Sequence, residues 1–168
     1  MAINVLFVCL GNICRSPTAH GIFEGYIKTR GLENLVSVDS AGTAKWHIGS
    51  PPDERSIAAA LERGYDLSHL RARQATAQDF DSFDYVLAMD ATNLDDLRRM
   101  CPQNFAGELD LFLNYIESSL GQVSEPRETN VPDPYFGGDE GFQHVVSLIE
   151  QASEGLVQHI IQKHELAV

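Results

Sequence analysis

The chain has 168 residues, of which 43% are hydrophobic, so its composition favours a globular domain with a sizeable core over a disordered segment. The 24 acidic residues outnumber the 12 basic ones, and a surface with a formal net charge of -12 repels nucleic acid and anionic lipid. No apolar run approaches the length of a membrane span and no signal peptide is recognised, so we expect no insertion into a membrane.

Strand-like and helix-like segments alternate along the chain. Strands are predicted over residues 3–8, 35–41, 84–89 and 108–112, where apolar residues run together or alternate with polar ones. Helices are predicted over residues 16–30, 53–63, 91–100 and 141–164, and the Pro- and Gly-rich segment 123–141 is predicted to be a loop. Strands that alternate with helices are joined by right-handed crossovers, so the sequence predicts a single α/β domain with a four-stranded parallel sheet and helices on both faces.

The segment CLGNICRS joins the first predicted strand to the first predicted helix, at an edge of the sheet where ligands bind. Ser16 is the predicted N-cap of this helix, and backbone N–H groups at a helix N-terminus attract a phosphate dianion. Gly11 and Asn12 tolerate the backbone angles of a tight cradle, and Arg15 offers a planar, charged fork to two phosphate oxygens. The segment therefore predicts a phosphate-binding loop after the first strand, formed by Leu10, Gly11, Asn12, Ile13, Cys14 and Arg15.

Cys9 stands at the start of this loop, in surroundings that favour its thiolate form. The charge of Arg15 stabilises a negative sulfur, and the Ser16 hydroxyl can donate to it, so Cys9 is the predicted nucleophile. A zinc site at Cys9 and Cys14 is a weaker interpretation, because no second Cys or His pair completes it. The lysine of a Walker A nucleotide-binding loop is missing. We therefore expect neither a metal nor any other cofactor.

The loop and four further stretches resemble the low-molecular-weight protein tyrosine phosphatase family. The further stretches are residues 39–43 with Trp46 and Gly49, then residues 68–74, 89–94 and 133–135. They keep the family's order over nearly the whole chain, so the resemblance implies one phosphatase domain over residues 1–168. It also implies hydrolysis of phosphotyrosine, in a protein or a small aryl phosphate, through a phosphocysteine intermediate and without a metal.

The resemblance assigns an acid to a loop far along the chain from Cys9. Asp133, in the stretch VPDPYFGG, is implied to protonate the tyrosyl oxygen as Cys9 attacks and then to activate water against the phosphocysteine. Trp46 and Tyr135 are implied to form walls that receive a flat phenyl ring. For Phe136, a place on this substrate rim and simple packing under its loop stay equally open.

A polar network is implied to support the phosphate loop. By resemblance it includes Asn12, Ser40 and His69, with Ser16 as a further supporting residue. Many relatives carry Glu at the position of His20, so proton coupling between that Glu and the histidine of the network is not carried over. The acidic run 79–84 is expected to be a solvated face.

The three cysteines carry information about redox chemistry. An odd number without framework spacing indicates a reducing compartment, so we expect a cytoplasmic protein. Cys9 and Cys14 belong to one curled loop, and Cys14 is either a buried packing residue or a thiol that forms a disulfide with oxidised Cys9. The resemblance favours the protective role.

Three rival functions are consistent with a loop of this kind. A thiol-relay arsenate reductase needs several mobile cysteines, whereas Cys101 is the only one outside the loop. Arginine phosphatases related to the family carry Thr where this chain has Ile13, and Ile13 offers no hydroxyl, so tyrosine is preferred. A catalytically dead phosphotyrosine-binding module is disfavoured because Cys9, Arg15 and Asp133 are intact. The oligomeric state, the physiological substrate and the pathway stay open.

Overall fold

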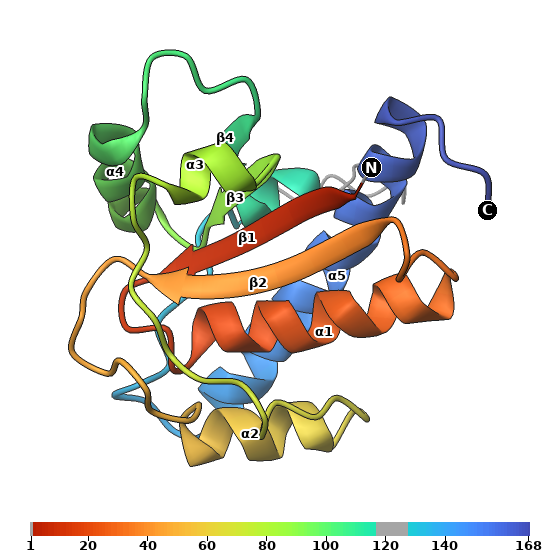
Figure 1. Cartoon of the computed structure of the whole chain (residues 1–168). Helices are drawn as coiled ribbons and strands as arrows, with labels where there is room; N and C mark the ends of the chain where they lie inside the picture. The colour runs from red at the N-terminus through yellow and green to blue at the C-terminus, as the bar shows by residue number, and fades with distance from the viewer. Residues whose placement is uncertain (1, 117–127) are drawn as a thin grey trace.

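The computed structural model describes residues 2–116 and 128–168, and these form three layers, with a central sheet between two groups of helices (Figure 1). The strands are β1 (Ile3–Cys9), β2 (Val36–Gly42), β3 (Tyr85–Ala88) and β4 (Glu108–Leu111). Their order in the sheet is β2-β1-β3-β4, and every neighbouring pair is parallel. This confirms the predicted four-stranded parallel sheet.

The helices cover both faces of the sheet, as predicted. They are α1 (Arg15–Thr29), α2 (Glu54–Leu61), α3 (Asp79–Ser82), α4 (Ala91–Met100), the 3-10 helix η1 (Phe112–Tyr115) and α5 (Asp139–Lys163). Helices α1 and α5 pack on one face, with α2 beside them, and α3 and α4 lie on the other (Figure 1). No helix within the described residues combines the length and apolar character needed to cross a membrane.

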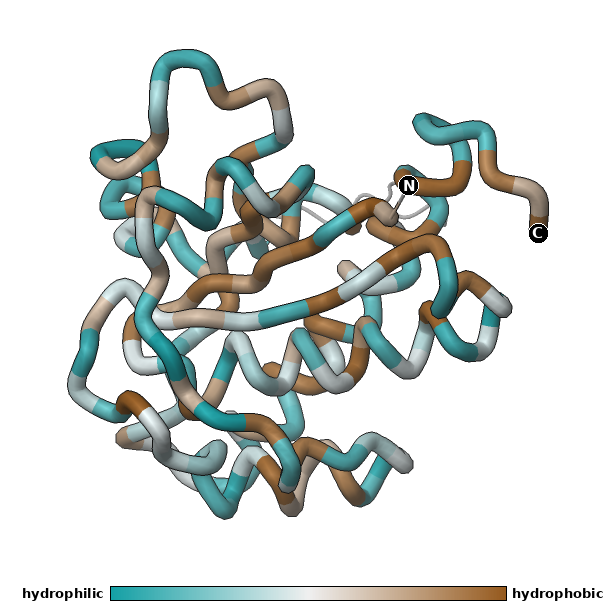
Figure 2. Tube along the Cα trace, in the orientation of Figure 1, coloured by the Kyte–Doolittle hydropathy of each residue, from teal (hydrophilic) through white to brown (hydrophobic). Residues whose placement is uncertain are grey.

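Strand β1 lies in the middle of the molecule, and both of its faces are buried. Val5 and Phe7 belong to the core beneath α1 and α5, whereas Leu6 and Val8 belong to the core beneath α4. The Phe7 ring meets the ring of Phe23 from α1 at a centroid distance of 5.5 Å. A parallel strand covered by helices on both sides needs apolar residues at every position, which explains the hydrophobic stretch along β1 (Figure 2).

Two of the differences from the sequence prediction bear on the functional site. Helix α1 begins at Arg15 with Cys14 as its N-cap residue, and no side chain caps it. Ser16, the predicted N-cap, lies inside the first turn, and its hydroxyl contacts Cys9, Asn12 and Ala41 instead. The acidic run contains a short helix that was not predicted, α3, and Asp79 in it is buried rather than solvated. Its carboxylate is compensated by an ion pair with Arg73, so the prediction of a solvated face is wrong for Asp79.

The C-terminal ends of β1, β2 and β3 lie at one edge of the sheet. There, the segment after residue 72 runs parallel to the end of β2: Gly42 N–H donates to the Arg73 carbonyl at 2.8 Å, and Ala75 N–H donates to the Gly42 carbonyl at 2.8 Å. This edge holds Cys9 and Gly42 directly opposite each other, and it is where the predicted phosphate loop begins.

Candidate active site

Cys9 is the last residue of β1, and its sulfur is nearly enclosed, with 3% of the residue exposed. The Cys9 Sγ lies 3.0 Å from the Ser16 Oγ, and the backbone N–H of Asn12 donates to it at 3.3 Å. The single proton of the Ser16 hydroxyl can go to Cys9 or to the Ala41 carbonyl, 3.3 Å away. A hydroxyl and an amide aimed at one sulfur stabilise its thiolate form.

Asn12 holds the curvature of the loop. Its φ of 57° lies in the left-handed region, which Asn tolerates better than most residues. Its buried side chain is held at both ends: Oδ1 accepts from the Arg73 N–H at 3.0 Å, and Nδ2 donates to the Ser16 Oγ at 2.7 Å. These two bonds compensate the backbone strain and orient Ser16 toward Cys9.

Gly42 lets the loop close against β2. A Cβ at this position would lie 2.7 Å from the Leu10 carbonyl oxygen and 3.1 Å from the Asn12 nitrogen, both of them backbone atoms that cannot move aside. Within the described residues, the N–H groups of Gly11, Ile13 and Cys14 donate to no protein acceptor. Unpaired amides on one curled segment at a helix N-terminus form a cradle for an oxyanion.

Arg15 extends into the same cradle and is held by three groups. Its Nη1 donates to Asp90 Oδ2 at 2.5 Å and to the Val131 carbonyl at 3.2 Å, and its Nη2 lies 3.7 Å from Asp133 Oδ2. Burial opposes the charge, but the Cys9 sulfur and the Asp90 carboxylate outweigh it and raise the pKa of Arg15. The guanidinium is therefore a fixed cation beside Cys9.

Cys9, Arg15 and Asp133 line one cavity of about 220 Å³. Asp133 lies above Arg15 with 43% of its side chain exposed, in the irregular segment that precedes α5. The phosphate-loop residues Leu10, Gly11, Ile13 and Cys14 line the cavity as well, together with Trp46, His47, Tyr135 and Phe136. The structure thus brings together the nucleophile, the cation and the acid that were predicted.

Aromatic side chains surround the mouth of this cavity. Trp46 is 69% exposed and Phe136 is 94% exposed, so neither is packed beneath its own loop. The Tyr135 and Phe136 rings meet edge to face at a centroid distance of 4.9 Å. All three rings are on the rim, where they can contact a flat substrate.

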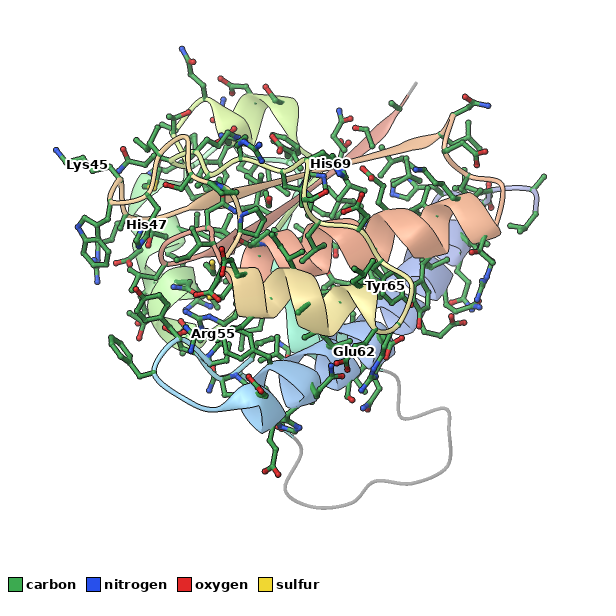
Figure 3. All side chains as sticks on the ribbon, turned by 90° about the horizontal axis from the view of Figure 1, so that it is seen from below. Lys45, His47, Arg55, Glu62, Tyr65 and His69 are labelled. Atoms are coloured by element: carbon green, nitrogen blue, oxygen red, sulfur yellow. The ribbon has the colours of Figure 1, made fainter. Side chains whose placement is uncertain are left out.

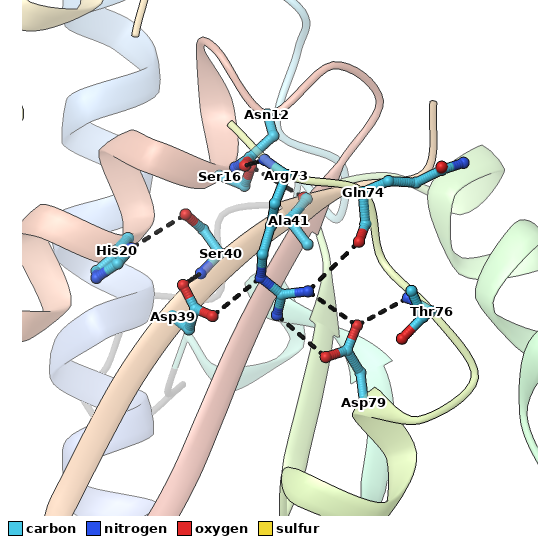
Figure 4. A network of polar contacts seen from close by, with 10 residues as sticks. All are labelled: Asn12, Ser16, His20, Asp39, Ser40, Ala41, Arg73, Gln74, Thr76 and Asp79. Atoms are coloured by element: carbon cyan, nitrogen blue, oxygen red, sulfur yellow. Dashed lines mark hydrogen bonds and ion pairs between the residues drawn. The ribbon is translucent and has the colours of Figure 1, made fainter. Parts of the chain in front are cut away.

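A partly buried ion-pair network supports the backbone segment that binds Asn12 (Figure 4). Arg73 donates from Nε to Asp39 Oδ2 at 3.0 Å, and its Nη1 and Nη2 donate to the two carboxylate oxygens of Asp79, both at 3.1 Å. Asp79 also accepts from the Thr76 N–H at 2.8 Å. Two carboxylates from different elements therefore fix the residue whose N–H binds Asn12.

The supporting histidine is a different one from that expected. His69 is exposed and makes no hydrogen bond within the described residues, so the structure does not bring it to Ser40 or Asn12. His20 lies there instead, with its Nδ1 3.0 Å from the Ser40 Oγ (Figure 4). On its other side, the His20 Nε2 is 3.5 Å from the Glu24 Oε2. His20 is one turn beyond Ser16 on α1, so both side chains reach β2 from one helix face.

Cys14 lies buried in the loop, close to Ser56 of α2. Burial raises the pKa of the Cys14 thiol to about 12, and the nearby Ser56 hydroxyl offsets only part of this rise. At neutral pH, Cys14 is thus a neutral thiol, whereas Cys9 is surrounded by donors. Both cysteines are free.

Sequence reasoning assigned no role to four residues that shape this site, namely His20, Gly42, Arg73 and Asp90. Asp90 had a local signal, because it caps α4 by accepting from the Asn93 N–H at 2.8 Å. Its bond to Arg15 joins segments 75 positions apart, and no sequence pattern predicts that contact. Within the described part of the chain, no group of three or more His, Cys, Asp or Glu is arranged to hold a metal ion.

Comparison with known proteins places this geometry in context. A family model for "Low molecular weight phosphotyrosine protein phosphatase" matches residues 4–166. The low-molecular-weight protein-tyrosine-phosphatase YfkJ of Bacillus subtilis is 41% identical over 164 residues, which cover 98% of this chain and 99% of the relative. The crystal structure of a protein tyrosine phosphatase from Entamoeba histolytica superposes with a TM-score of 0.86 at 34% identity, covering 98% of this chain and 100% of that chain. A Drosophila arginine phosphatase gives a TM-score of 0.82 at 34% identity, over 92% of this chain and 96% of that chain.

Proposed function

Because the chain belongs to the low-molecular-weight phosphotyrosine protein phosphatase family, we propose that Cys9, Arg15 and Asp133 divide its protein-tyrosine-phosphatase reaction among them. The observation that carries this proposal is that the three side chains line one cavity, with the Cys9 sulfur at the start of the loop that carries the unpaired amides and the Asp133 carboxyl 3.7 Å from the Arg15 guanidinium. A nucleophile, a fixed cation and an acid are the groups that hydrolysis of a phosphate monoester needs.

In the first step, the Cys9 thiolate attacks phosphorus. A P–S bond forms while the bond from phosphorus to the tyrosyl oxygen breaks, and protonated Asp133 gives its proton to that oxygen. The amides of Gly11, Ile13 and Cys14 and the fork of Arg15 bind the phosphoryl oxygens. They stabilise the charge that these oxygens carry in the transition state.

In the second step, water replaces the sulfur. Asp133, now a carboxylate, takes a proton from water as a P–O bond forms and the P–S bond of the phosphocysteine breaks. The products are inorganic phosphate and the Cys9 thiolate, which the Ser16 hydroxyl and the Asn12 amide stabilise as a leaving group.

The rim supports phosphotyrosine as the substrate. A phenyl ring can lie between Trp46 and Tyr135 while its phosphate reaches Cys9 below, whereas the shorter phosphoserine would leave the aromatic rim without contact. We propose phosphotyrosine-containing proteins or small aryl phosphates as substrates. We also propose a cytoplasmic location, because the nucleophilic thiol must stay reduced.

Two rival reactions have specific evidence for and against them. The likeness to an arginine phosphatase keeps phosphoarginine as a second candidate substrate. Ile13, at the cavity wall, is the residue that we expect to determine the preference between phosphotyrosine and phosphoarginine. A thiol relay is disfavoured because Cys101 packs against the core on the opposite face of the sheet from Cys9.

The test compares phosphotyrosine, phosphoserine and phosphoarginine peptides, with released phosphate as the measurement. We expect the wild type to prefer phosphotyrosine. The Cys9→Ser variant should bind inorganic phosphate yet lose turnover, because a serine hydroxyl is a far weaker nucleophile and leaving group than a thiolate. Near wild-type hydrolysis by Cys9→Ser would refute the covalent mechanism, and a preference for phosphoarginine would replace the substrate.

A further inference from the structure

Arg55, in the first turn of α2, connects the segment that carries Asp133 to the phosphate loop (Figure 3). We propose that Arg55 is a positioning residue for general acid catalysis, which sets where the Asp133 carboxyl stands above the bound phosphate. The proposal rests on the acid role of Asp133, and its experiment is arranged so that the two can fail separately.

The Arg55 guanidinium binds the backbone of residues 133–137, which we call the acid segment because they include Asp133. Its Nη2 donates to the Tyr135 carbonyl at 2.8 Å, and its Nη1 donates to the Gly137 carbonyl at 3.3 Å. The guanidinium also lies over the Tyr135 ring, 5.6 Å from its centroid. The N–H of Tyr135 in turn donates to Asp133 Oδ1 at 3.1 Å. Arg55 therefore binds Tyr135, the residue whose N–H orients the Asp133 carboxyl.

The same side chain is fixed to α2 and, through it, to the phosphate loop. Its Nε and Nη2 bind the two oxygens of Asp53 at 3.1 and 3.0 Å. The Asp53 backbone N–H donates to the Ile13 carbonyl at 2.8 Å. Phe142 of α5 lies beneath the guanidinium, with its ring centroid 4.7 Å away. An unbroken series of contacts thus runs from Ile13 through Asp53 and Arg55 to the acid segment.

Asp133 depends on such an anchor because little else holds it. Residues 128–138 form no helix or strand. Within the described residues, the Asp133 carboxyl contacts only the Tyr135 N–H and, at 3.7 Å, Arg15, which already binds Asp90 more closely. A shift of about 1 Å in a reacting group can cost about 10²-fold in rate, so the position of this segment bears directly on proton transfer.

Positioning the segment of Asp133 requires the planar geometry of an arginine side chain. The guanidinium engages four acceptors at once, namely two carboxylate oxygens and two carbonyl oxygens in different directions. A lysine ammonium keeps the charge but cannot span these acceptors from a single rigid plane. Arg55→Lys should therefore recover only part of what Arg55→Ala loses.

The experiment measures kcat/KM for phenyl phosphate, whose leaving group needs a proton, and for p-nitrophenyl phosphate, whose leaving group does not. We expect Arg55→Ala to lower kcat/KM for phenyl phosphate about 10-fold or more, and that for p-nitrophenyl phosphate by less than about 3-fold. The inhibition constant of inorganic phosphate should stay within about twofold, because the amide cradle is intact. Circular dichroism and the Tm establish that each variant is folded.

The matched control is Arg63→Ala. Like Arg55, Arg63 is an arginine that pairs with a carboxylate, in its case Glu150 of α5. It also donates to Ser147 at 3.0 Å, but it does not touch the acid segment. It should leave both kcat/KM values unchanged. The decisive variant is the double substitution of Arg55→Ala with Asp133→Ala, in which the loss caused by Arg55→Ala should disappear because there is no acid left to position.

The outcomes separate the two proposals. If Asp133→Ala lowers kcat/KM for phenyl phosphate and for p-nitrophenyl phosphate by the same factor, the acid role of Asp133 is wrong. If Asp133→Ala affects phenyl phosphate selectively but Arg55→Ala does not, or if the effect of Arg55→Ala persists at full size in the double variant, the positioning role is overturned.

Discussion

The Arg15 guanidinium and the Asp90 carboxylate are joined by a 2.5 Å contact between Nη1 and Oδ2, although Asp90 also caps helix α4. One aspartate therefore fixes both the start of a helix after β3 and the cation of the phosphate cradle after β1. The Arg15 side chain is therefore oriented by the way in which the ends of β1 and β3 pack side by side.

Asp90→Asn should lower kcat/KM for phosphotyrosine about 10- to 100-fold, since a charge-assisted hydrogen bond is worth about 1.5–3 kcal/mol. The guanidinium of Arg15 would lose the partner that holds it toward the phosphate. Asp96→Asn, which removes a surface ion pair with Arg99, is the control and should be silent. A kcat/KM for Asp90→Asn within about twofold of the wild type would refute the orienting role.

Arg15→Lys should lose most of the activity while the protein stays folded. A lysine carries the charge but offers a single donor group in place of a fork that binds two phosphoryl oxygens. The measurement is kcat/KM together with the inhibition constant of phosphate, and both should deteriorate. Retention of both values would show that charge alone is sufficient at this position.

Ile13→Thr should raise activity on phosphoarginine relative to phosphotyrosine, because a hydroxyl at the cavity wall can contact a guanidinium or order water. The ratio of the two kcat/KM values is the quantity to measure. Ile13→Val, which shortens the side chain without adding a hydroxyl, separates polarity from size. An unchanged ratio in Ile13→Thr would remove Ile13 from the specificity role.

Peroxide should inactivate the wild type reversibly, with mass spectrometry showing a Cys9–Cys14 disulfide and with thiol reductant restoring activity. Bound phosphate should slow the inactivation because it covers Cys9. Cys14→Ser should be active but harder to rescue after oxidation. Equal recovery of the two proteins without a disulfide would leave Cys14 as a packing residue.

The pH dependence of this disulfide follows from the buried thiol. With the pKa of Cys14 raised to about 12, its thiolate is scarce at neutral pH, and the thiolate is the attacking species. The rate at which oxidised Cys9 is captured should therefore rise about tenfold per pH unit between pH 7 and 9. To measure this rate, the enzyme is oxidised at pH 7 and shifted to a higher pH, and the decrease of labelling by a probe for sulfenic acid is followed over time. A rate independent of pH would contradict it.

Glu108, at the opposite end of the sheet from Cys9, should make stability depend on pH. Burial would raise the pKa of Glu108, but hydrogen bonds from Lys163 and Tyr115 outweigh it and lower the pKa below its ordinary value of 4.5. A lowered pKa means that the stabilisation is complete above pH 4.5 and is lost as the pH falls through the folded-state pKa.

Glu108→Gln should thus cost about 0.5–1 kcal/mol in the free energy of unfolding at pH 7, with the difference shrinking at lower pH. Urea denaturation of both proteins at pH 7 and at about pH 3 measures this. Glu128→Gln, at an exposed pair with His144, is the control. A difference of equal size at both pH values would show that the carboxylate charge is not responsible.

Local sequence signals determined the parts of this protein that depend on neighbours along the chain. The buried run of β1, the glycine and asparagine after it, and the cysteine and arginine of CLGNICRS predicted the strand, the cradle and the nucleophile. The alternation of strands and helices predicted the parallel sheet, because right-handed crossovers leave few other arrangements. These features follow from backbone propensity, side-chain chemistry and the order of elements along the chain.

The family resemblance had already implied Asp133, Trp46 and Tyr135, but only the tertiary structure decided which other distant residues support the site. Asp90 binds Arg15, Arg73 binds Asn12 and Arg55 grips the acid segment because strand ends and loops meet at one edge of the sheet. The same packing placed His20, rather than His69, against Ser40. Polar contacts of this kind depend on distances of about 3 Å between elements far apart in the chain, and no periodicity of the sequence encodes such distances.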